Sequence, residues 1–123
     1  MFKDTLVYND YDGNQITQDV YFNYSKMDIM RMEYNEDGKL SNFLKNIVNM
    51  AKDKEMFNKF EEFVCGAYGI KSPDGKMMVK KIDGKPVVED FKASPAYDVF
   101  WMKMFTEENY IEKFVRSVIP EVD

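Results

Sequence analysis

The sequence predicts a helix-rich α+β fold in a single domain over residues 1–123. Near the N-terminus, apolar and polar residues alternate around a cluster of turn formers, as in a β-hairpin. Most of the remaining chain has apolar residues at spacings of three and four, as in amphipathic helices. The length of 123 residues suits one domain, and the sequence contains no repeat, low-complexity tract or linker.

The N-terminal hairpin is predicted for residues 3–23. The strand-forming residues 5–8 lead into a turn-forming cluster at 9–14, and strict alternation follows. One face of the second strand carries Ile16, Val20 and Phe22. Because an isolated hairpin is only marginally stable in water, this face must pack against the helices that follow.

A short helix is predicted after the hairpin. Ser25 and Asp28 have the spacing of a capping box, in which each residue satisfies the other's backbone N–H. The helix carries Met27, Met30 and Tyr34, and it ends at a loop over residues 35–38.

Two longer helices should then form a helical hairpin. The first has an apolar stripe made of Leu40, Phe43, Leu44, Ile47, Val48 and Ala51. After a break at residues 51–54, a second stripe is made of Met56, Phe57, Phe60, Phe63, Val64, Ala67 and Tyr68. Gly69 follows this stripe and suits a left-handed helix cap.

The C-terminal third begins with turn formers and ends in helices. Residues 70–93 predict a second small hairpin or an ordered loop between helices, with turns at 72–75 and 83–86. Ser94 and Pro95 suit the start of the next helix. We expect Thr106 to cap the last helix, which Pro120 ends.

The composition favours a binding protein over an enzyme. The chain has ten methionines, no histidine and one cysteine. Methionine is common on surfaces that adapt to a partner, whereas many catalytic and metal sites use histidine or several cysteines. Cys65 lies in an apolar helical stretch and is interpreted as a small buried residue. We therefore expect no catalytic site, no cofactor and no metal.

The charge and hydropathy pattern exclude two kinds of partner. Twenty-two acidic and seventeen scattered basic residues give a net charge of −5, which disfavours nucleic acid. No apolar run approaches the length of a membrane span, and residues 1–5 lack the apolar segment of a secretory signal. We expect a cytoplasmic protein that binds neither nucleic acid nor membrane.

One segment is similar to an enzyme motif. Residues 6–14 resemble the first strand and aspartate loop of haloacid-dehalogenase-type phosphatases, with Asp10 as nucleophile and Asp12 as acid and base. Asn9 and Asn14 depart from that pattern, and the strand that returns directly after the turn suits antiparallel pairing. The pattern favours a hairpin turn rich in aspartate and glycine.

Residues 97–105 are apolar nearly all the way round a helix. Such a helix cannot place every large side chain on one core-facing stripe, so some should face a partner. The predicted contacts are Trp101, Met102, Met104, Phe105, and then Tyr21 and Met32. The alternative is a helix that is buried centrally on both sides.

Nearly the whole chain resembles the tail assembly chaperones of long-tailed phages that infect Gram-positive bacteria. The resemblance rests on the order of several segments and not on one diagnostic motif. These segments are 11–14, 21–26, 68–76, Ala96 with Tyr97, and the ending Phe114, Val115, Ile119 and Pro120.

The resemblance implies a role without catalysis. Such a protein would coat the tape-measure protein, help to recruit major tail protein, act in the host cytoplasm and be absent from the virion. In that family a frameshift often gives a longer product, and this chain would correspond to the short form. Self-association of the chain is left open by the sequence. The alternative to a chaperone is a phage or bacterial inhibitor, or another interaction protein, that binds a host protein.

Overall fold

The computed structural model describes residues 1–34 and 40–120, except for the side chains of residues 33, 34 and 40–43. It confirms a helix-rich α+β fold with an N-terminal hairpin. The strands are β1 (Phe2–Asn9), β2 (Gln15–Phe22), β3 (Tyr68–Lys71), β4 (Met78–Val79), β5 (Lys81–Ile82) and β6 (Lys85–Pro86). The helices are α1 (Lys26–Tyr34), α2 (Leu40–Lys52), η1 (Lys54–Met56), α3 (Phe57–Ala67), α4 (Val88–Ala93), α5 (Pro95–Thr106) and α6 (Tyr110–Val118).

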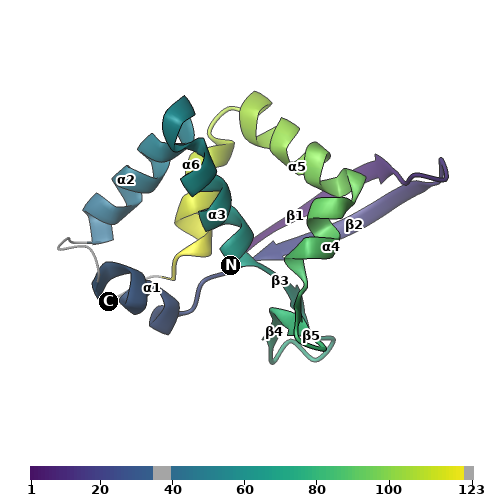
Figure 1. Ribbon diagram of the computed structural model, residues 1–123, viewed down its shortest axis with the longest axis horizontal. Coiled ribbons are helices and arrows are strands. Elements are labelled where there is room, and N and C mark those ends of the chain that lie inside the picture. Colours follow the sequence, from purple (N-terminus) through teal and green to yellow (C-terminus); the bar gives the residue numbers. More distant parts are fainter. Residues whose placement is uncertain (35–39, 121–123) are drawn as a thin grey trace.

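The hairpin forms as predicted and begins an antiparallel sheet in the order β1-β2-β3-β4. Its register runs from Phe2 opposite Phe22 to Asn9 opposite Gln15. In Figure 1 the hairpin extends beyond the helices, with α5 lying along it, while α2, α3 and α6 group beyond its base, away from the tip. The sheet therefore has one face covered by helices near its base, and a free tip.

Helix α1 begins with the predicted capping box. The Ser25 N–H donates to the Asp28 carboxylate at 2.9 Å, and the Asp28 N–H donates to the Ser25 hydroxyl oxygen at 3.0 Å. Ile29 enters the core, whereas Met27 and Met30 are exposed. The predicted loop at 35–38 lies outside the described residues.

The segment between α3 and α5 contains the predicted second hairpin and more. Strand β3 pairs with β4, and β5 pairs with β6. The prediction of a helix cap at Gly69 is wrong, because α3 ends at Ala67 and Gly69 lies in β3. A Cβ atom at Gly69 would lie 2.6 Å from Cγ of Met78, so a larger residue there would displace the Met78 side chain.

Two features of the C-terminal helices differ from the prediction. Helix α4, of six residues, was not expected. Thr106 does not cap α6: it is the last residue of α5, and its hydroxyl donates to the Met102 carbonyl at 2.6 Å. Asn109, with a φ of 63°, precedes α6 and makes no side-chain cap.

Aromatic rings in contact with one another form the centre of the core. The Phe22 ring lies 4.8 Å from the Phe100 ring and 5.2 Å from the Phe114 ring, joining the sheet to α5 and α6. All three side chains are fully buried. Aromatic pairs at these distances stabilise a core beyond the area that they bury.

Lys80 fastens the β4–β5 connection to two other segments. Four carbonyl oxygens, those of Asn23, Gly66, Ala67 and Tyr68, lie between 2.6 and 3.2 Å from its ammonium nitrogen and share its three N–H donors. Three of these carbonyls belong to the end of α3 and the start of β3, where a helix favours a cation. Burial lowers the pKa of Lys80 to about 8, so the side chain keeps its charge at neutral pH.

Asp4 joins β1 to the last two helices. Its carboxylate accepts hydrogen bonds from Lys103 at 3.0 Å and from the Tyr110 hydroxyl at 2.7 Å. Burial alone would raise the pKa of Asp4, but the bonds from Tyr110, Lys103 and the Thr5 N–H leave it below its ordinary value. The Thr5 carbonyl also accepts from Lys103, so both backbone groups of Thr5 are used within the chain.

Candidate functional site

Helix α5 divides its large apolar residues between the core and the surface. Met102 and Phe105 are 61% and 58% exposed, whereas Trp101 and Met104 are 8% and 2% exposed. Trp101 and Met104 are therefore core residues and do not offer a surface to a partner. Met102 and Phe105 remain predicted contacts.

Trp101 forms the support beneath Phe105. Its ring lies 5.2 Å from that of Phe57 and 5.8 Å from that of Phe105. The rings of Phe57 and Phe105 are themselves 5.8 Å apart. Phe105 thus projects from a fixed aromatic base, which limits its freedom and suits a contact residue.

A hollow lies beside Phe105, where α2 ends and α3 begins. Its volume is about 510 Å³. It is lined by Ala51, Lys52, Asp53, Lys54, Phe57 and Phe105. Three of these residues supply apolar walls and the other three a charged rim, which is the composition of a site for an amphipathic partner.

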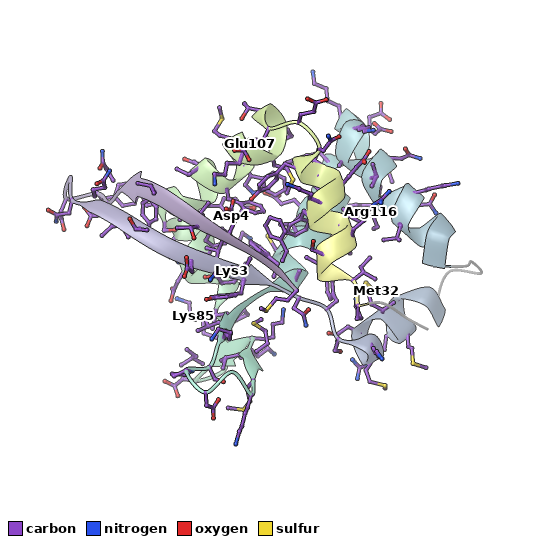
Figure 2. The ribbon with its side chains drawn as sticks, turned by 180° about the vertical axis from the view of Figure 1, so that it is seen from behind. Lys3, Asp4, Met32, Lys85, Glu107 and Arg116 are labelled. Atoms are coloured by element: carbon purple, nitrogen blue, oxygen red, sulfur yellow. The ribbon has the colours of Figure 1, made fainter. Side chains whose placement is uncertain are left out.

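A second hollow lies between α2 and α6. Its volume is about 520 Å³. It is lined by Leu44, Lys45, Val48, Asn49, Glu112, Val115 and Arg116. Val115 forms a buried floor, while Leu44 and Val48 are half-buried. Arg116 lies on the side of α6 that is near α2 (Figure 2).

The two hollows lie along the same flank of α2. Residues 45, 48 and 52 are spaced by three and four and share one side of a helix. We call the surface made by the residues of both hollows the α2–α6 seam. Of the partner contacts predicted from the sequence, only Phe105 lies in this seam. Lys45 and Lys52 could be placed on one helical face from their spacing, but their neighbours on α6 could not.

Tyr21 and Met32 lie away from the seam. Tyr21 is half-buried on the outer face of the sheet, with the ammonium groups of Lys3 and Lys71 at 5.8 and 5.7 Å from its ring centre. Met32 packs half-buried on α1. Figure 2 shows Lys3, Met32 and Glu107, which follows α5, in separate parts of the molecule. The six predicted contacts therefore do not form one surface.

Asp10 and Asp12 lie in the exposed turn of the β1–β2 hairpin. The Asp10 carboxylate accepts the backbone N–H groups of Asp12 at 3.0 Å and Asn14 at 2.8 Å. Gly13 has a φ of 86°, which the tight turn requires. The carboxylate of Asp10 thus closes a turn between antiparallel strands, and it does not end a parallel strand as the phosphatase pattern requires.

Cys65 is half-buried against Tyr97. Its sulfur lies 3.6 Å from the Tyr97 hydroxyl, which donates to Glu61 at 2.6 Å. Burial raises the pKa of the Cys65 thiol, which leaves little reactive thiolate at neutral pH. Among the described residues, no group of three or more cysteines and carboxylates could hold a metal ion.

The comparisons point to one family. A family model described as phage tail assembly chaperone matches residues 1–122. No curated protein and no solved structure matches the chain. In the described ranges, 1–34 and 40–120, no helix combines the length and apolar character needed to cross a membrane.

Proposed function

The chain belongs to the phage tail assembly chaperone family, and from this we propose that it binds the tape-measure protein and helps to recruit major tail protein to it. It acts without catalysis in the cytoplasm of the infected bacterium, and it is absent from the finished virion. The family match over residues 1–122 is the observation that carries the proposal.

The surface of the chain supports binding to a helical partner. Met102 and Phe105 expose large apolar groups on α5, and Phe105 lines the hollow at the end of α2. A tape-measure helix presents repeated apolar stripes, and methionine adapts to varied side chains along such a stripe. The contact residues that we propose are Phe105 and Met102, followed by Tyr21 and Met32.

Co-expression with a tape-measure fragment tests this function. The wild-type chain should keep the fragment soluble and co-purify with it in several copies. Met102→Ala and Phe105→Ala should weaken this effect. Met77→Ala is the matched control, because Met77 is 63% exposed on the β3–β4 turn, and it should retain the wild-type effect. A fragment that stays insoluble with the wild-type chain would contradict the proposal.

The same experiment separates the alternative functions. An inhibitor of a host protein would do nothing for the solubility of the tape-measure fragment. A phosphatase would hydrolyse a generic phosphate ester and lose this activity in Asp10→Asn. We expect no hydrolysis by either form.

Recruitment and location are tested separately. Immobilised tape-measure fragment should retain more major tail protein when the chain is present. Mass spectrometry of purified particles should detect tape-measure protein and not this chain. Equal retention without the chain would contradict the recruitment step alone.

A further inference from the structure

The α2–α6 seam differs in charge from the rest of the molecule. The whole chain has a net charge of −5. The seam carries four basic residues and two acidic ones. The basic residues are Lys45, Lys52, Lys54 and Arg116, and the acidic ones are Asp53 and Glu112. An acidic protein thus concentrates positive charge around one apolar surface.

The positive charges of the seam are available to a partner. All four basic side chains are exposed. The ion pairs of the described part of the chain use other cations, namely Lys3, Arg31, Lys85, Lys92 and Lys103. Asp53 is occupied differently, because its carboxylate accepts the Glu55 N–H at 2.9 Å and caps η1. The seam therefore presents more free positive than negative charge.

The seam has the dimensions of a short helix. From Leu44 to Lys52, where α2 ends, the helix rises roughly 12 Å, at about 1.5 Å per residue, which is just over two helical turns. Leu44, Val48 and Ala51 are half-buried along this path, and Phe105 stands exposed at its end. This arrangement gives a partner helix an apolar track with an aromatic anchor.

We propose that the α2–α6 seam binds an amphipathic helix of a partner protein whose apolar stripe is flanked by glutamate or aspartate. The inference rests on the proposed function, because it names the chemistry of the tape-measure segment that the chain would hold. The apolar stripe fills the two hollows, and the acidic flanks face Lys45, Lys52, Lys54 and Arg116. Charges at such a rim select the partner and steer its approach.

Two synthetic helical peptides with the same leucine stripe test the charge preference. One carries glutamate beside the stripe and the other carries lysine. Binding to the full chain is measured by fluorescence anisotropy at low and high salt. The glutamate peptide should bind at least about tenfold more tightly at low salt, and added salt should reduce this difference.

Charge reversal locates the site. Lys52→Glu with Arg116→Glu should abolish the preference for the glutamate peptide. The control is Lys76→Glu with Lys81→Glu, which makes the same change in net charge on exposed residues of the β3–β6 region. It should keep the preference. Circular dichroism melting should show that both double variants fold.

Three results of the peptide-binding and sedimentation experiments would overturn the inference. They are equal affinity for the two peptides, equal effects of the two double variants, and sedimentation of the free chain as a dimer that Lys52→Glu with Arg116→Glu dissociates. The last result would mean that a second copy occupies the seam. Co-expression distinguishes this failure from that of the proposed function. If the seam double variant keeps the tape-measure fragment as soluble as wild type does, the function stands and the seam inference fails.

Discussion

The aromatic core and the α2–α6 seam each take a phenylalanine from α5, but the two residues differ in what covers them. Phe100 is fully buried and stacks on Phe22, whereas Phe105, five residues later on the same helix, is 58% exposed. Met104 and Met102 differ in the same way. The comparison teaches that one helix can supply both the core and a binding surface, and that only its neighbours decide which residue does which.

The largest effect on stability should come from the core. Phe100→Ala removes a buried ring between the sheet and α6 and leaves a cavity, so unfolding should become easier by about 3–5 kcal/mol. This is a large part of the stability of a typical domain. Chemical denaturation monitored by circular dichroism measures the change. A loss below about 1 kcal/mol would show that the core can collapse around the gap, and would break the contrast with the seam.

A smaller loss is expected where the sheet and α3 are fastened together. Lys80→Met keeps much of the side-chain volume but removes the donor to four carbonyls. The Ala67 carbonyl keeps a hydrogen bond from the Asn23 N–H, so the loss of this charged donor should cost about 1–3 kcal/mol in total. Denaturation of Lys80→Met measures the cost. Lys81→Met, at an exposed neighbouring position, serves as control and should remain at wild-type stability.

Asp4 should make the free energy of unfolding depend on pH under acidic conditions. Its pKa is lowered in the folded chain, so its contribution is complete above the unfolded value, near 3.8, and is lost as pH falls through the folded value. Asp4→Asn should destabilise the chain by about 1 kcal/mol at neutral pH and flatten the acid limb of the stability curve. An unchanged acid limb in melting curves from pH 2 to 6 would contradict this.

The smallest change in stability should come from the seam. Phe105→Ala removes a ring that is more than half exposed, so the free energy of unfolding should fall by about 1 kcal/mol or less. The same variant should show the clearest loss of binding to the glutamate peptide, because the anchor is gone. If the free energy of unfolding of Phe105→Ala falls by several kcal/mol and the variant still binds the glutamate peptide, Phe105 is a core residue and not a contact.

The parts of the fold that local chemistry determines could be predicted from the sequence. The hairpin follows from alternation and turn residues, and the start of α1 follows from Ser25 and Asp28. Gly69 was assigned wrongly because its role depends on Met78, which lies across the strand pair. Helix α4 was missed because six residues give too short a pattern to recognise.

Less of the candidate site could be predicted, for a similar reason. Residues 97–105 do contain more large apolar groups than the core accepts, but the sequence did not indicate that Trp101 would be covered by Phe57 and Phe60. The basic rim was missed because it joins α2 to α6, which lie far apart in the chain. Long-range neighbours of this kind leave no local signal.

The bonds that Asp4 and Lys103 make to Thr5 have a further consequence for contacts between copies of the chain. An outer strand with unused backbone donors and acceptors templates the stacking of molecules into fibres. Near the start of β1 that row is interrupted, because the backbone N–H and carbonyl of Thr5 are already bonded. This interruption discourages two copies from pairing edge to edge at this point of β1.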